Sequence, residues 1–259
     1  MSTYKNVLLI GAMMLLVLIG RAWYVSHGSS SVTTAPGTTA SAISTFPISS
    51  PFTEGTRYYT IAVNYPTTTP LTAAANQAAL QMMRSYLAGQ VVEFKTQGNF
   101  NHLTQQNVQV GSYGLGHKES LQIDYLIASS AHTVSYIYTE YIGILGAHSN
   151  LFFKTFTFDK TTGKLLSLGA VFKDGSSYLK KLSVLTRAQL TDSLGPSADT
   201  QMLNSGTKPQ ESSFQNFFFD NGYFVLLFSP YQVAAYAAGP QTVRLPASSL
   251  RGVLSPQYP

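Results

Sequence analysis

The 259-residue chain is rich in apolar residues, poor in charge and free of cysteine. Its hydrophobic content of 44% is ample for a folded core and excludes a chain that is disordered throughout. Charged residues make up 10% of the chain, and the net charge of +5 is scattered, which argues against a nucleic-acid partner. The absence of cysteine excludes a disulfide framework and a zinc–thiolate site.

The first 25 residues carry an apolar run, 7–19, followed by Arg21, Trp23 and Tyr24. The run is shorter than the roughly 20 residues of a spanning helix and has the length of a signal-peptide core. Arginine and aromatic residues behind it are typical of a membrane–water interface, and no clean small-x-small cleavage motif follows. We therefore predict a single membrane anchor, with secretion after signal cleavage as the alternative.

Residues 26–53 are rich in Ser, Thr and Pro and show no apolar period. This composition is typical of a flexible tether, although an ordinary disordered terminus has the same appearance. The remainder, 54–259, is predicted to form the folded domain, with subregions of about 54–130 and 131–259.

The first subregion begins with an alternating segment, 58–66, that predicts a strand ending at proline. Residues 72–94 follow as a helix that covers a sheet, because apolar side chains recur at spacings of three and four. Residues 97–120 are polar and contain three glycines around Tyr113. They match no phosphate-binding motif and predict a loop, in which Tyr113 is a secondary candidate for partner binding.

The middle of the chain predicts an antiparallel meander. Residues 121–129 and 132–144 are β-rich and joined by a short connection. Residues 150–168 are predicted to form a hairpin, in which Asp159 is the turn acceptor and Gly163 takes φ > 0. The strand before that turn has one apolar and one mixed face, which predicts a sheet covered on one side.

The C-terminal part predicts a helix from Tyr178 to the residue before Gly195, lying on the apolar face of the meander. Residues 197–213 are predicted to form an exposed connection with room for one short turn. Behind it, Asn221 and Gly222 predict a type I′ turn between two strands, 214–219 and 223–228. A last strand, 242–245, and a short helix from Pro246 to about Val253 complete the chain. The predicted fold class is α+β, with an antiparallel meander, hairpins and helices packed on one face.

Motifs for catalysis are absent from the sequence. None of the five histidines lies in H-E-x-x-H, no G-x-S-x-G occurs, and the few acidic residues stand mostly at turns. We expect no metal, no cofactor and no catalytic activity. An envelope hydrolase or peptidoglycan-modifying enzyme with a nonstandard site is the alternative, and a purely structural envelope protein is a third hypothesis.

Two segments are candidate sites. Around the bend Gly146, His148 and Asn150, we expect His148 to hydrogen-bond the local backbone, with ligand contact as the alternative. The uncharged loop between 228 and 239 is the candidate for partner binding, because rigid aromatic rings beside small residues suit docking of a protein or a sugar ring. The alternative is that its tyrosines cap the sheet. Its residues of interest are Pro230, Tyr231, Tyr236 and Gly239.

Four features together resemble a known family: residues 146–150, the aromatic strand behind them, 158–165 and 228–239. Over roughly 58–254 the chain resembles the extracytoplasmic domain family of the anti-sigma factor RsiV, and also the non-catalytic N-terminal region of the peptidoglycan deacetylase PdaC. The resemblance implies a domain held outside the cell membrane that binds a lysozyme-like, wall-active protein or a wall polymer. Only about six residues precede the predicted anchor, so we expect that the chain is not an anti-sigma factor by itself.

Overall fold

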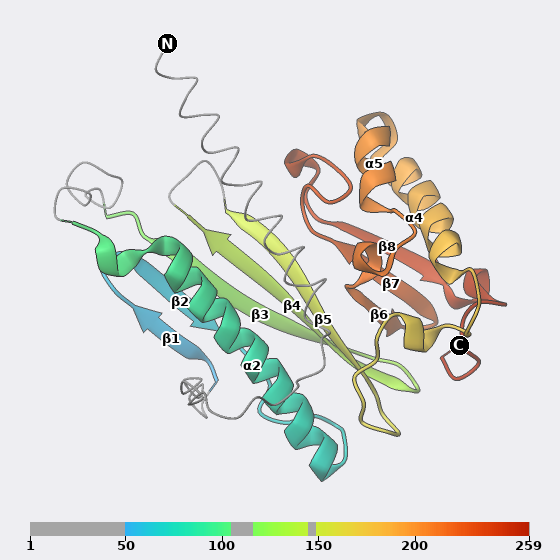
Figure 1. Cartoon of the computed structure of the whole chain (residues 1–259), viewed down its shortest axis with the longest axis horizontal. Helices are drawn as coiled ribbons and strands as arrows, with labels where there is room; N and C mark the ends of the chain where they lie inside the picture. Colours follow the sequence, from blue (N-terminus) through green and yellow to red (C-terminus); the bar gives the residue numbers. More distant parts are fainter. Residues whose placement is uncertain (1–49, 105–115, 145–148, 259) are drawn as a thin grey trace, which may run out of the picture. The chain divides into compact units, whose positions relative to one another are not determined.

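The computed structural model describes residues 50–104, 116–144 and 149–258, which all fall within one compact unit. Within these ranges the chain forms an α+β fold with two β-sheets and three α-helices (Figure 1). The predicted anchor and nearly all of the predicted tether, together with Tyr113, Gly146 and His148, lie outside the described residues. Among the helices that are described, none combines the length and apolarity needed to cross a bilayer.

The first sheet has five strands in chain order, and its second and third strands are parallel. All other neighbours are antiparallel, so the sheet is mixed. The strands are β1 (Phe52–Gly55), β2 (Tyr59–Val63), β3 (Glu119–Ser129), β4 (Thr133–Gly143) and β5 (Asn150–Asp159).

The predicted meander is confirmed for β3, β4 and β5, but the expectation of antiparallel pairing throughout is wrong for β2 and β3. The long crossover between them contains the helix α2 (Ala73–Gly98), which returns the chain to the end of the sheet at which β2 begins. Such a connection allows parallel pairing, whereas a hairpin turn does not. Strand β1 was not anticipated, and it begins at Phe52, within the segment predicted as tether.

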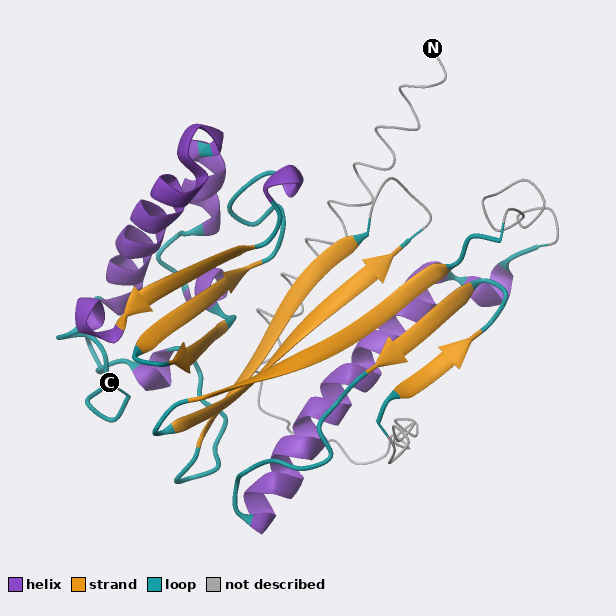
Figure 2. Ribbon diagram, turned by 180° about the vertical axis from the view of Figure 1, so that it is seen from behind, coloured by secondary structure: helices purple, strands orange, loops and turns teal. Residues whose placement is uncertain are grey.

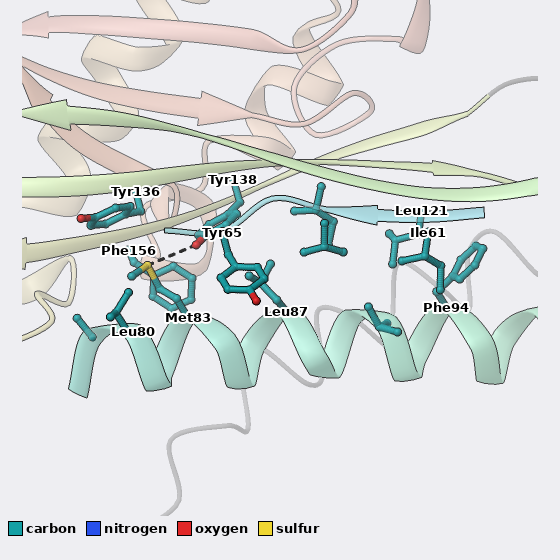
Figure 3. Packing of buried hydrophobic residues seen from close by; sticks show 14 of the residues in the cluster. Ile61, Tyr65, Leu80, Met83, Leu87, Phe94, Leu121, Tyr136, Tyr138 and Phe156 are labelled. Carbon is teal, nitrogen blue, oxygen red and sulfur yellow. Dashed lines mark hydrogen bonds between the residues drawn. The ribbon is translucent and has the colours of Figure 1, made fainter. Parts of the chain in front are cut away.

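Helix α2 lies along one face of the five-stranded sheet, as predicted (Figure 1). Its buried stripe carries the apolar residues expected from the spacing: Leu80, Met83, Leu87, Val91 and Phe94. In Figure 3, Leu80 and Met83 of this stripe lie near Tyr136, Tyr138 and Phe156, and Phe94 lies near Ile61 and Leu121. The helix ends four residues later than predicted, where Asn99 adopts the left-handed conformation with φ of 51°.

The second sheet is antiparallel and has three strands: β6 (Phe217–Asp220), β7 (Tyr223–Phe228) and β8 (Gln241–Pro246). The predicted type I′ turn is confirmed, because Asn221 and Gly222 both have positive φ, 46° and 78°. The C-terminal helix appears as a single 3₁₀ turn over Ala247–Leu250.

Helix α4 (Tyr178–Leu194) has the predicted bounds but packs against this second sheet. Its buried Leu182 and Leu190 belong to the core that contains Phe224 and Val243. The prediction that α4 lies on the meander is wrong, because α2 already covers that apolar face. A short helix, α5 (Thr200–Gly206), stands in the connection predicted to be exposed, and Asp199 caps it by accepting the backbone N–H of Met202.

The turn after β5 is as predicted, but the return strand is not formed. Gly163 has φ of 69° and donates its N–H to the Asp159 carbonyl at 2.8 Å. Beyond it only one isolated bridge, between Phe158 and Leu165, continues the pairing.

The second sheet occupies the place beside β5, contrary to the prediction of a sheet covered on one side. The Thr157 hydroxyl donates to the Phe217 carbonyl at 2.9 Å, and the Phe217 N–H donates to the Thr155 hydroxyl at 3.1 Å. The backbone N–H of Thr155 donates to the Asn216 side chain at 3.2 Å. Side chains therefore satisfy an edge that would otherwise be open for pairing with another strand.

Candidate functional site

The loop between β7 and β8, residues 229–240, is held firmly at its middle. Val233 and Ala234 are buried, with 0% and 2% of their surface exposed. The Gln232 side chain donates to the Ser213 carbonyl at 3.1 Å. The end of α5 approaches so closely that a Cβ added at Gly206 would collide with the carbonyl of Gln232. The loop is thus a rigid support for the tyrosines on it.

Tyr231 differs from the rest of this loop because the residue is 41% exposed and its φ is 67°. Two other described non-glycine residues have positive φ, and both are asparagines in expected places, Asn99 at a helix end and Asn221 in a hairpin turn. A tyrosine pays a steric penalty of about 1 kcal/mol or more for this conformation. Such strain is concentrated at sites of function, where it aims a side chain.

Tyr236 supports Tyr231 and joins the loop to the first sheet. The two ring centroids are 5.5 Å apart, and the rings are inclined by 34°. The Tyr236 hydroxyl donates to the Ser149 carbonyl at 2.7 Å, immediately before β5. Tyr236 is half-buried. It therefore has a structural role as well as a share in the aromatic surface.

The rest of the loop adds small or rigid residues and no charge. Pro230 precedes Tyr231 and is partly exposed. Gly239, with φ of 68°, turns the chain into β8. The loop contains no acidic, basic or histidine residue. It therefore offers an aromatic contact surface, and it holds no group of its own for acid–base chemistry.

Asp159, at the far end of β5 from Ser149, is a buried structural acceptor. Its carboxylate accepts the Thr162 N–H at 2.6 Å and the side chains of Gln257 and Tyr258 at 2.9 Å each. Burial alone would raise the pKa of Asp159, but the hydrogen bonds from Thr162 and Tyr258 outweigh it and hold the pKa below its ordinary value. Burial and the Asp159 charge raise the pKa of Tyr258 to about 12.

The remaining predicted motif residues do not gather into one site. Asn150 opens β5 opposite Ile142, close in sequence to Ser149. Gly163 belongs to the turn at the other end of β5, and Asn221 with Gly222 forms the β6–β7 turn. The structure thus brings Tyr231 and Tyr236 together near the start of β5, and it leaves the others in separate turns.

Sequence reasoning missed two carboxylates that accept tyrosine hydroxyls, the partly exposed Glu54 and the fully buried Glu140. Glu54 accepts the Tyr59 hydroxyl at 2.5 Å and the Lys95 ammonium at 2.6 Å. Burial works to raise the pKa of Glu54, but these hydrogen bonds and the Lys95 charge lower it overall. Glu140 is 0% exposed and accepts the Tyr86 hydroxyl. Its place in strand alternation with Tyr136 and Tyr138 was the available signal for an inward-facing acid.

These acids do not form a metal site. Within the described ranges, no three histidine or acidic side chains are grouped so that they could hold a metal ion. Glu140 is sealed from solvent, so a substrate does not reach it in this conformation.

The fold defines the class of protein: an α+β domain built from a mixed five-stranded sheet and an antiparallel three-stranded sheet. Residues 170–248, which contain α4 and the second sheet up to β8, match the family model described as "Protein of unknown function (DUF3298)". Over 204 residues the chain is 30% identical to the peptidoglycan-N-acetylmuramic acid deacetylase PdaC of Bacillus subtilis (strain 168). This match covers 77% of the chain and 40% of that enzyme.

Two solved structures share the fold. A DUF3298 family member from Bacteroides fragilis NCTC 9343 has a TM-score of 0.53 and 16% identity, over 77% of this chain and 85% of that one. A DUF3298 family protein from Pseudomonas aeruginosa PAO1 has a TM-score of 0.50 and 17% identity, over 79% of this chain and 89% of that one. The distant relation to PdaC rests on the 30% identity over 204 residues, whereas the resemblance to RsiV stays a prediction.

Proposed function

We propose that this chain is a membrane-tethered, extracytoplasmic recognition domain that binds a glycan of the cell wall through Tyr231 and Tyr236. A relative named for an activity on peptidoglycan supports the wall as the setting, although the chain spans only 40% of that enzyme. A lysozyme-like protein, the partner class implied by the resemblance to RsiV, is the alternative occupant of the same surface.

The exposed ring of Tyr231 at positive φ is the observation that carries this proposal. A residue that served only to cap the sheet would gain nothing from a strained backbone and would bury its ring. An exposed, rigidly supported ring gains contact area with a partner while losing little conformational freedom on binding.

The chemistry of the loop favours a sugar. An aromatic face packs against the apolar face of a sugar ring, and a second ring inclined to the first extends that contact. With no charge in the loop, a neutral ligand meets no desolvated ion on binding.

Calorimetric titration of the full chain with soluble wall glycan fragments, and separately with lysozyme, tests the proposal. We expect Tyr231→Ala to weaken glycan binding by about 2 kcal/mol, the size of an interface hot spot. Tyr231→Gly should weaken binding equally, yet unfold at a higher temperature than Tyr231→Ala, because glycine accepts φ of 67° without strain.

Tyr236→Phe is the matched control, since it keeps the ring and removes the hydrogen bond to Ser149. It should lower stability by about 1 kcal/mol and retain most of the affinity. Glycan binding that survives alanine at both tyrosines would refute the proposed surface. If lysozyme binds and the glycan fragments do not, the ligand is a lysozyme-like protein in place of a glycan. Turnover of the fragments would favour the enzyme alternative.

A further inference from the structure

The face of the five-stranded sheet opposite α2 is covered at one end and open at the other. Near the end of β5, Ser135, Thr155 and Thr157 are buried, and the two threonines bond the segment that leads into β6. Toward the start of β5, no helix or strand of the described residues lies over this face; Figure 2 views the sheet from this side, with α2 behind it.

The strand register defines the residues of the open end, here called the sheet platform. One row crosses four strands through successive partners, and a second row crosses three. A third pairs Ser120 with Gly143, beside Ser149. The first two rows are Ala62, Gln122, Tyr141 and Leu151, then Asp124, Thr139 and Phe153.

The platform is continuous with the aromatic loop. At Gly143 an added Cβ would lie 2.6 Å from the Ser120 hydroxyl and 3.2 Å from the Ser149 hydroxyl, so these three residues adjoin one another. Ser149 is also the residue whose carbonyl accepts the Tyr236 hydroxyl. The tyrosine pair and the platform therefore adjoin at Ser149.

Charge on the platform argues for a neutral ligand. Asp124 is the one charged residue in its rows. Its two carboxylate oxygens already accept hydrogen bonds from Asn64 at 2.5 Å and from Gln122 at 2.7 Å. An anionic polymer would meet this carboxylate with no cation in the rows to balance it. An uncharged polymer would not.

Polarity of the platform argues for a sugar over a protein. Tyr141, 42% exposed, is the most exposed of the large apolar residues in these rows. Its strand partners are Gln122 on β3 and Leu151 on β5, and Leu151 and Phe153 are partly buried. A stable protein interface needs a larger apolar centre. The hydroxyl and amide groups of Ser120, Thr139 and Gln122, beside one exposed aromatic ring, match the hydroxyl, acetamido and apolar faces of N-acetylated sugars.

We propose that the sheet platform is the second part of the glycan site, so that an uncharged N-acetylhexosamine chain runs from Tyr231 past Ser149 to Tyr141 and Gln122. This inference rests on the proposed function and extends it to an oligosaccharide. Strands β3 and β5 are two strand spacings apart, about 10 Å, which one sugar at the tyrosine pair does not span.

Titration of the full chain with N-acetylglucosamine oligomers of increasing length tests the platform. Wild type should bind the hexamer about tenfold more tightly than the dimer, the gain of one further aromatic contact. Tyr141→Ala and Gln122→Ala should remove that gain and leave dimer affinity unchanged. Ile127→Ala is the matched control, because Ile127 is an exposed residue of β3 on the other face.

The outcomes separate the two proposals. If Tyr231→Ala weakens binding of every oligomer while Tyr141→Ala leaves the hexamer unaffected, the platform is wrong and the proposed function stands. If the hexamer and dimer bind wild type equally, the platform is also wrong. If no oligomer binds, or Tyr231→Ala has no effect, both are wrong. Thermal unfolding of each variant shows whether it is folded at the temperature of the titration, so that a loss of affinity is not caused by unfolding.

Discussion

The two sheets solve the same packing problem with different side chains. The core between α2 and the five-stranded sheet is rich in tyrosine, with Tyr65, Tyr136 and Tyr138 nearly or fully buried. The core between α4 and the three-stranded sheet has Tyr258 as the one tyrosine among its buried residues, beside leucines and phenylalanines that include Phe214 and Phe224. It is here called the phenylalanine core.

Buried tyrosine hydroxyls lower the stability that the core between α2 and the five-stranded sheet contributes. A buried hydroxyl needs a partner, and the Tyr138 hydroxyl donates to the sulfur of Met83, a weak acceptor, at 3.5 Å. The Tyr136 hydroxyl has no hydrogen-bond partner among the described residues, and burial raises the pKa of Tyr136 to about 12. We therefore expect the phenylalanine core to contribute more stability per ring, while the first sheet presents the exposed polar face.

The largest effect is expected for Phe224, in the middle of the phenylalanine core. Phe224 meets Phe172, Phe217 and Phe219 at centroid distances of 5.3 to 5.6 Å. Phe224→Ala should lower the free energy of unfolding by about 4 kcal/mol, because it leaves a cavity among rings. Tyr136→Phe, the control in the other core, should change it by less than about 1 kcal/mol or stabilise. Chemical denaturation measures both changes in unfolding free energy. Comparable losses in the two variants would contradict the expected difference in stability between the two cores.

A second test compares the turns of the two regions. Gly163 and Gly222 have φ of 69° and 78°, but only a Cβ at Gly163 would collide, with Ala75 of α2. Gly163→Val should therefore cost about 2 kcal/mol, from strain and overlap, and Gly222→Val about 1 kcal/mol, from strain alone. Equal shifts in the thermal midpoint of the two variants would show that α2 moves away at Ala75 without loss of stability, so that the overlap adds nothing to the strain.

The smallest effect concerns the bond between the regions, from Tyr258 of the second core to Asp159 of the first sheet. Tyr258→Phe should cost about 1 kcal/mol at pH 7. Because the folded pKa of Asp159 is lowered, its stabilisation is complete above the unfolded pKa, near 4, and disappears as the pH falls through the folded value.

The gap in unfolding free energy between wild type and Tyr258→Phe should accordingly narrow in acid. Measurements of unfolding free energy between pH 7 and pH 2 follow this gap, and Tyr223→Phe, at a residue that is 37% exposed, is the control. A gap that stays constant over this range would show that the Asp159 charge does not strengthen the bond.

Local chemistry explains which predictions succeeded. The Asn221–Gly222 turn, the φ of Gly163 and the buried stripe of α2 depend on residues near one another in sequence, so pattern alone identified them. The return strand after Gly163 failed because side chains and backbone from the second sheet compete for the edge of β5.

By itself, the sequence determined the strands other than β1, the two long helices, the tight turns and an uncharged aromatic loop, since each follows from spacing or from the conformational range of single residues. Tertiary structure decided the parallel pairing of β2 with β3, the sheet on which α4 packs, the strained φ of Tyr231 and the junction of Tyr236 with Ser149. These depend on contacts between segments far apart in the chain, which compete for the same apolar faces and strand edges and leave no local periodic signal.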